Sequence, residues 1–145
     1  MDRREQFYEE IQKTMAIALA TAAEGRVTMR VVSPVLYKGG ILMFTEAGSL
    51  KYRQLRDNPH CCISAGIFFA EATARFFGPC LTAENEPLRK AYSEKFPGAF
   101  DEGVEFGGRH AEFILLQPTR LSGWAFADDK PTEDGIPNAP FELLL

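Results

Sequence analysis

The chain has 145 residues, 46% hydrophobic and 25% charged, and a formal net charge of -4 at pH 7. These values are typical of one globular domain with a single core. The acidic balance argues against nucleic acid as the main partner, which calls for a basic face. The charged N-terminus lacks an apolar signal segment, and no stretch approaches the ~18 apolar residues that span a bilayer. We therefore expect a cytoplasmic protein that binds neither nucleic acid nor membrane.

The N-terminal part of the chain predicts one helix and then short strands. Asp2 and Glu5 have the spacing of a capping box, and an apolar stripe of helical period follows: Phe7, Ile11 and Met15. Pro34 interrupts the β-rich sequence after residue 32, so it is expected at a sheet edge or a bulge. Strands are predicted at residues 15–21, 27–32 and 41–45, separated by turns at residues 24–25 and 38–40.

The remainder predicts two short helices among further strands. One helix begins at Ser49 as N-cap and ends before Pro59, and Asn85 is expected to cap the next. Pro118 should break the last β-rich segment. Strands are predicted at residues 61–67, 72–81, 112–117 and 119–126, with connections at 68–70 and 98–110. The pattern indicates a mainly β fold, a six- to seven-stranded antiparallel barrel or sandwich with a few short helices.

The helix that begins at Ser49 has its charges reversed. Lys51 and Arg53 lie in its first turn, where the helix dipole favours acidic side chains, and its only acid, Asp57, lies at the C-terminal end. A bound anion would remove this conflict, because free N–H groups, the dipole and Lys51 would all face it. In the alternative interpretation, Ser49 only caps the helix and the basic residues form a solvated face.

Further donors are expected near the same point. Thr45 ends the preceding strand, and antiparallel pairing of the strand at 27–32 with the strand at 41–45 would bring Arg30 close. Glu46 would have to point away or be hydrogen-bonded. Arg30, Thr45, Ser49 and Lys51 therefore make a candidate phosphate site.

These residues resemble a known family. Thr-Met-Arg30-Val-Val-Ser-Pro, Phe44-Thr-Glu-Ala-Gly-Ser49-Leu-Lys51, Gln54-Leu55 and Asn58-Pro59 are similar to the pyridoxamine 5'-phosphate oxidase superfamily of FMN-binding split barrels, and the small nitroimidazole-reductase-like members are nearest in length. The resemblance implies a split β-barrel over residues 1–127, followed by a C-terminal tail over residues 128–145. It also implies a homodimer with FMN at the interface, against which the segment 141–145 would pack.

The resemblance also assigns roles to single residues. Leu50 would add a backbone N–H to the phosphate site, and Phe44 would flank the ribityl chain. Thr73 matches a residue that reaches FMN from the second subunit, Gly78 a strand glycine, and Trp124 a tryptophan near the flavin, although Trp124 also fits ordinary core packing. The main chain at three residues would line the isoalloxazine: Val31, Val32 and Ser33.

Several positions depart from true pyridoxamine phosphate oxidases. Val35 stands where those enzymes have a lysine, and Phe96 stands where the Tyr-x-x-x-Arg-Pro stretch has its arginine. The C-terminal Arg-x-His is absent. We therefore expect a substrate other than pyridoxamine phosphate.

Other reactive residues give weaker signals. Cys61, Cys62 and Cys80 lack metal-type spacing and are interpreted as small hydrophobes, with a redox role as the alternative. His60 and His110 are interpreted as structural, no metal site is predicted, and no catalytic acid or base stands out.

The expected function is an FMN-dependent oxidoreductase acting on a small molecule. The flavin would carry the redox chemistry, and the protein would bind and orient it, with Arg30 and Lys51 as anchors. Two alternatives stay open: a split barrel that uses deazaflavin or haem, and a flavin-binding protein without turnover that serves in storage, sensing or electron transfer.

Overall fold

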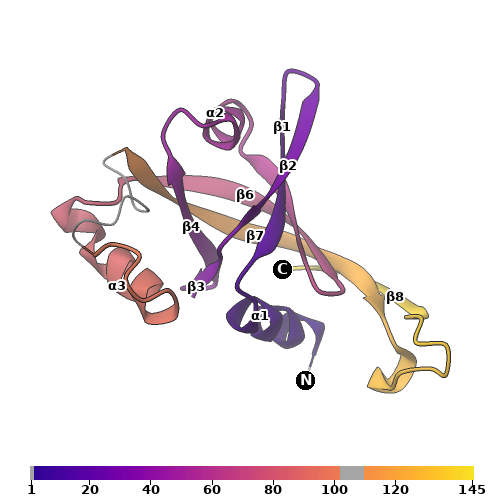
Figure 1. Cartoon of the computed structure of the whole chain (residues 1–145). Coiled ribbons are helices and arrows are strands. Elements are labelled where there is room, and N and C mark those ends of the chain that lie inside the picture. Colours follow the sequence, from indigo (N-terminus) through magenta and orange to yellow (C-terminus); the bar gives the residue numbers. More distant parts are fainter. Residues whose placement is uncertain (1, 102–109) are drawn as a thin grey trace.

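The computed structural model describes residues 2–101 and 110–145, so the expected loop at 98–110 lies largely outside the described residues. Within them the chain forms three α-helices and eight strands, with short 3-10 turns at 83–85 and 127–129 (Figure 1). The helices are α1 (Arg3–Lys13), α2 (Leu50–Asp57) and α3 (Glu86–Lys95). The strands are β1 (Ile17–Ala23), β2 (Arg26–Val32), β3 (Val35–Tyr37), β4 (Gly40–Glu46), β5 (His60–Ala65), β6 (Phe68–Pro79), β7 (Ala111–Ala125) and β8 (Ala139–Leu144).

The strands form one antiparallel sheet in the order β2-β1-β5-β6-β7-β4-β3, with β8 added to β7. The predicted mainly β, antiparallel architecture is confirmed. The predicted pairing of Arg30's strand with 41–45 is wrong, because β2 pairs with β1 and β4 pairs with β7. Only Ser33 and Pro34 connect β2 to β3, so the sheet curls until its first and last strands approach each other. The sheet is not closed, which leaves the opening of a split barrel between them (Figure 1).

The helices begin close to where capping residues predict them. Asp2 and Glu5 form the capping box of α1, and Phe7 and Ile11 are fully buried. Met15 does not extend this stripe, since α1 ends at Lys13 and the Met15 side chain is 57% exposed. Asn85 occupies the N-cap position of α3 as predicted, but its side chain makes no capping hydrogen bond.

Two sheet segments differ from the sequence prediction. The turn between β5 and β6 lies at residues 66–67, where Gly66 has φ +58°, so residues 68–70 belong to β6. Pro118 does not break β7: Ala72 pairs with Pro118 and Glu71 with Arg120, so a bulge takes up the extra residue.

Part of the expected tail forms β8, whose Phe141 ring lies 5.7 Å from the Phe68 ring. The division at residue 127 stays a prediction.

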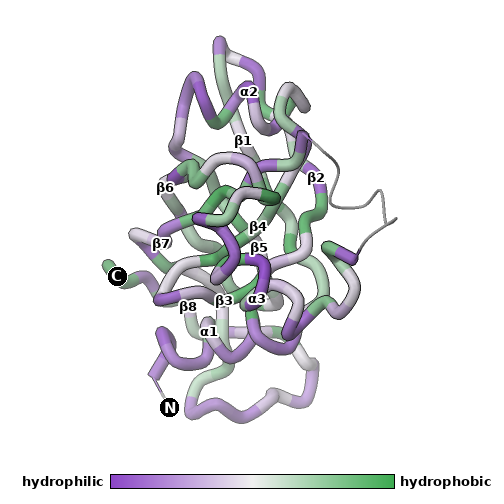
Figure 2. Tube along the Cα trace, turned by 90° about the vertical axis from the view of Figure 1, so that its left-hand side faces the viewer, coloured by the Kyte–Doolittle hydropathy of each residue, from purple (hydrophilic) through white to green (hydrophobic). Residues whose placement is uncertain are grey.

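The hydrophobic residues divide into two packed clusters. The larger one lies between the sheet, α1 and α2, and includes Phe7, Leu19 and Ile114. The smaller one packs α3 against β4 and β7 through Tyr92 and Phe113. Figure 2 shows hydrophobic stretches among the strands and a mostly hydrophilic connection between β7 and β8. In the ranges that the structure describes, we find no helix with both the length and the apolar character to cross a membrane.

Candidate anion-binding site

The candidate site begins at the N-terminus of α2. Ser49 caps the helix as predicted: its Oγ accepts a hydrogen bond from the Tyr52 N–H at 3.4 Å and lies 3.1 Å from Thr45 Oγ1. The first turn of α2 holds no acidic residue. Among the described residues, the backbone N–H groups of Leu50 and Lys51 have no acceptor. This end of α2 therefore presents hydroxyl and amide donors, and no acidic residue lies in its first turn to pair with them.

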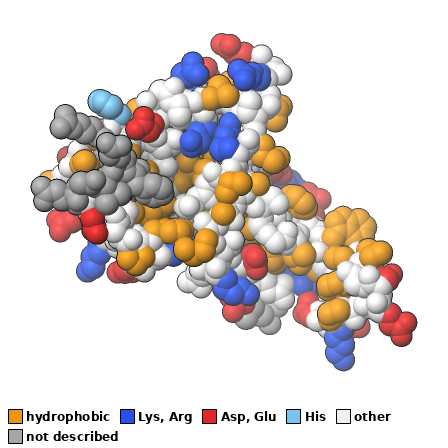
Figure 3. Space-filling view, viewed as in Figure 1, with side chains coloured by type: hydrophobic (Ala, Val, Ile, Leu, Met, Phe, Trp, Pro, Cys, Tyr) orange, Lys and Arg blue, Asp and Glu red, His pale blue; other side chains and the backbone are white. Residues whose placement is uncertain are grey.

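Two cations meet beside these donors. Burial lowers the pKa of Lys51, and the nearby Arg30 charge lowers it further; burial also lowers the pKa of Arg30. Within residues 2–101 and 110–145, neither side chain forms an ion pair, and Glu46 is exposed without pairing to either. Figure 3 shows Lys and Arg side chains gathered between β2 and β4 below α2. The fold thus holds two like charges together without a described counter-ion.

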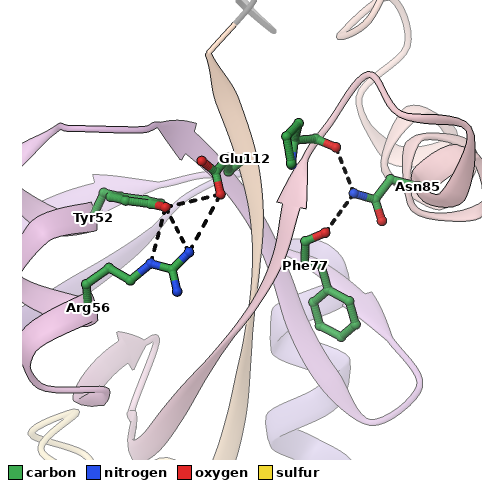
Figure 4. A network of polar contacts seen from close by, with 6 residues as sticks. Tyr52, Arg56, Phe77, Asn85 and Glu112 are labelled. Atoms are coloured by element: carbon green, nitrogen blue, oxygen red, sulfur yellow. Dashed lines mark hydrogen bonds and ion pairs between the residues drawn. The ribbon is translucent and has the colours of Figure 1, made fainter.

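The solvated-face interpretation applies to only part of α2. Arg53 and Arg56 are exposed, whereas Lys51 is half-buried. Arg56 donates to the Tyr52 hydroxyl at 3.0 and 3.2 Å, and that hydroxyl donates to Glu112 at 3.1 Å (Figure 4). The Arg56 guanidinium also lies 3.9 Å from the Phe76 ring centroid. This network fastens α2 to β6 and β7, and so fixes where its N-terminus points.

A cleft of about 360 Å³ lies next to Lys51. This volume is near the lower end for small-molecule pockets, so a mononucleotide would extend beyond it. Six residues predicted to contact a flavin line the cleft: Val31, Val32, Ser33, Phe44, Thr45 and Lys51. Three others join them: Glu46, Tyr92 and Ala111. The cleft brings together the end of β2, the end of β4 and the start of α2.

Residues 4–125 match the family model described as pyridoxamine 5'-phosphate oxidase. The chain belongs to the pyridoxamine 5'-phosphate oxidase family. No curated protein sequence is similar enough to this chain to count as a relative.

Solved structures share the fold of this chain at low sequence identity. The heme storage protein HutZ from Vibrio cholerae superimposes with a TM-score of 0.70 at 18% identity, covering 90% of this chain and all of that one (100%). A NimC/NimA family protein from Clostridium acetobutylicum gives 0.64 at 13% identity, covering 99% and 95%. An FAD-binding protein from Mesorhizobium loti gives 0.63 at 12% identity, covering 85% and 94%. Identities this low establish the fold alone.

Tyr92 lines the cleft although it is not among the predicted flavin contacts. Its hydroxyl donates to the Ser33 carbonyl at 3.0 Å, and burial raises its pKa to about 12. One turn later, the Lys95 ammonium donates to the carbonyls of Ile11 at 2.7 Å and Pro34 at 2.8 Å. Both side chains therefore hold the β2–β3 connection that lines the cleft. The helical spacing of Leu88 and Tyr92 predicts burial, but only the tertiary structure reveals the Ser33 contact.

Five predicted flavin contacts are not among the residues that line this cleft: Arg30, Ser49, Leu50, Thr73 and Trp124. Thr73 lies in β6 opposite His60 and Gln117, and Trp124 lies near the far end of β7, 53% exposed. Gly78 sits at a bulge of β6 with φ +79°, a conformation that favours glycine. His60 and His110 are exposed and do not line the cleft. The described residues contain no cluster of three or more His, Cys, Asp or Glu side chains suited to a metal ion.

The cysteines differ in exposure. Cys61 and Cys80 are buried, and burial raises the pKa of both thiols to about 12. Cys62 is exposed, and its pKa is also raised, by partial burial and by Glu71. Since the thiolate is the reactive form, the structure gives none of these three residues the environment of a redox-active cysteine.

Proposed function

We propose that this family member is an FMN-dependent oxidoreductase that acts on a small organic substrate. The observation that carries the proposal is the pair formed by Arg30 and Lys51, which lacks a described counter-ion beside the free N–H groups of α2. A phosphate monoester carries up to two negative charges and accepts several hydrogen bonds. It would satisfy the cations, the hydroxyls and the helix dipole together.

The residues present fit a mononucleotide. Arg30, Thr45, Ser49 and Lys51 would hold the phosphate, with the Leu50 N–H as a further donor. The main chain from Val31 to Ser33 would face the ring system, and Phe44 would flank the chain between them; all four line the cleft. FMN supplies the redox chemistry when bound, and the protein supplies affinity, orientation and nearby positive charge.

We propose that the substrate carries no phosphate group that the cleft has to bind. Val35 is buried in the core around α3, and Phe96 packs on Tyr92 at 5.2 Å between ring centroids. The polar groups of Tyr92 and Lys95 already donate to main-chain carbonyls. Val35 and Phe96 therefore provide no second cationic site for a phosphate group, and pyridoxamine phosphate is a poor candidate for the substrate.

A homodimer is proposed from exposed apolar side chains on one face of the sheet. Val27, Met29 and Val31 of β2 point to the same side and are 73%, 69% and 68% exposed. Their partners on β1 are alanines, and the same face carries Phe69 and Trp124. Large exposed apolar patches mark interaction sites.

The proposed dimer face continues into the cleft, because Val31 belongs to both. The cleft of one copy is too small for a mononucleotide, and a second copy packed against this face would enlarge it with further lining residues. Thr73 shares this face through its pairing with His60, and Trp124 shares it with Ser122. Thr73 and Trp124 would then contact the flavin in the partner's cleft, as the family resemblance implies.

The absorption spectrum of the purified protein tests which cofactor it carries. FMN gives one band in the visible and one in the near ultraviolet, deazaflavin a single band at shorter wavelength than the visible flavin band, and haem an intense Soret band. The structural likeness to HutZ makes haem the rival. Flavin reduction by NADPH or NADH, followed by reoxidation with a nitroaromatic compound or a quinone, would support an oxidoreductase. Protein that retains FMN but is not reduced by either nucleotide would instead indicate storage, sensing or electron transfer.

A further inference from the structure

Gln54 is a buried polar residue outside the cleft. It lies in α2 and is only 4% exposed. Its amide oxygen accepts hydrogen bonds from the hydroxyls of Thr21 at 2.6 Å and Thr28 at 2.5 Å. Its amide nitrogen donates to the Arg26 carbonyl at 3.2 Å. The carbonyl acceptor on one side and the hydroxyls on the other together fix which way the amide faces.

The same two threonines hold Arg30. Nη1 donates to Thr21 Oγ1 at 2.7 Å and to the Leu19 carbonyl at 3.2 Å, and Nη2 donates to Thr28 Oγ1. A guanidinium can only donate, so both hydroxyls must accept from Arg30 and send their own protons elsewhere. Gln54 Oε1 receives both protons. The amide oxygen is thus the acceptor that the two hydroxyl protons share.

We propose that Gln54 is a positioning residue that orients Arg30 toward the phosphate of the bound mononucleotide. The inference rests on the proposed function of the site. A guanidinium has five N–H groups. The three hydrogen bonds that Arg30 makes to described residues come from Nη1 and Nη2, which leaves the Nε–H and one Nη2–H for a ligand. These two neighbouring donors form a fork suited to two phosphate oxygens.

Preorganisation explains why the network is buried. An unrestrained arginine loses side-chain entropy when it binds an anion, and a restrained one has already lost it on folding. Without the Gln54 oxygen, the two hydroxyl protons would compete for other acceptors and Arg30 would lose its fixed orientation. Gln54 therefore acts on the phosphate through Arg30 and contacts no ligand itself.

The test compares FMN with riboflavin, which has the same ring and ribityl chain but no phosphate. We expect Gln54→Met to raise the Kd for FMN about 5- to 10-fold, the size of roughly one lost hydrogen bond. The Kd for riboflavin should change less than about 2-fold. Asn58→Ala is the matched control: Asn58 ends α2 and donates to the Ala22 carbonyl of β1 at 3.0 Å, but it does not touch Arg30. It should shift both ligands equally.

The outcomes separate this inference from the proposed function. Wild-type protein that binds FMN no more tightly than riboflavin would overturn both. A wild-type preference for FMN that survives in Gln54→Met, or an equal loss for both ligands, would overturn only the role of Gln54. If Gln54→Met does not fold, Thr28→Val tests the same network from the strand, with the same selective loss of FMN expected.

Discussion

Removing the charge of Lys51 should change ligand affinity and stability in opposite directions. Lys51→Met keeps the aliphatic stem and loses the ammonium group. A charge-assisted contact to phosphate contributes about 1.5–3 kcal/mol. At about 1.4 kcal/mol for each factor of ten, the Kd for FMN should rise roughly 10- to 150-fold. Titration of the apoprotein followed by flavin fluorescence measures this change.

The apoprotein should become slightly more stable. Burial and Arg30 lower the pKa of Lys51, so the fold disfavours its charged form. A basic residue in the first turn of a helix costs about 0.3–1 kcal/mol, and its removal should raise the Tm by about 1–4 °C. This gain should be full near pH 7 and disappear as the pH rises through the ordinary lysine value of 10.5.

Arg53→Met is the matched control, because Arg53 lies in the same turn but is exposed. It should leave the FMN affinity within about 2-fold, as expected of a screened surface charge. If Lys51→Met bound FMN as the wild type does, or if Arg53→Met lost as much affinity, the anion site would be assigned wrongly.

Four further predictions follow from individual contacts. Gly78→Ala should lower the free energy of unfolding in urea by about 1–2 kcal/mol, because φ is +79° while the space for a Cβ is open; an unchanged midpoint would argue against this bulge. Tyr92→Phe leaves the Ser33 carbonyl without its donor and should cost about 1–3 kcal/mol in thermal unfolding. Between pH 10 and about 12, Tyr92 ionises in the unfolded state but stays protonated in the folded state, so the free energy of unfolding of the wild type should fall as the pH rises through this range. Tyr92→Phe should not show the part of this decrease that comes from Tyr92. Cys61 and Cys80, with pKa values of about 12, should react with a thiol reagent at pH 8 only after unfolding; rapid labelling of the folded protein would contradict their burial. Met29→Glu, at a position 69% exposed, should convert the proposed dimer to a monomer in sedimentation while changing the stability of the monomer by less than about 0.5 kcal/mol; a dimer that persists would point to another interface.

Local signals in the sequence were sufficient for the elements that form the site. Ser49 was identified as an N-cap because a serine precedes the helical pattern, and Asn58-Pro59 marked its end. The misplaced charge of Lys51 was visible because the dipole argument needs only position along one helix. These signals work because capping and dipole effects act within one turn.

The sequence does not predict which distant strands and side chains lie next to one another. Arg30 was expected beside Thr45 through direct strand pairing, yet β2 and β4 lie at opposite ends of the sheet order. Curling of the sheet brings them to the same opening, and periodicity does not record curvature. The Ser33–Tyr92 and Thr28–Gln54 contacts span 59 and 26 positions along the chain, and no local pattern marks such partners.

The predicted boundaries of the last strands are wrong for a related reason. Pro118 appeared to divide the last β-rich segment, but a bulge at this point lets β7 continue. Residues 139–144 carried no strong strand signal, since their pairing depends on the exposed edge that β7 offers after the bulge. In both cases the neighbouring strand decides the local structure.

A crystal structure with FMN tests the central claim most directly. The account predicts the FMN phosphate at the N-terminus of α2, with its oxygens within hydrogen-bond distance of the Lys51 ammonium, the Ser49 hydroxyl and the Arg30 guanidinium. A phosphate bound elsewhere, or no FMN in the cleft at saturating concentration, would contradict it.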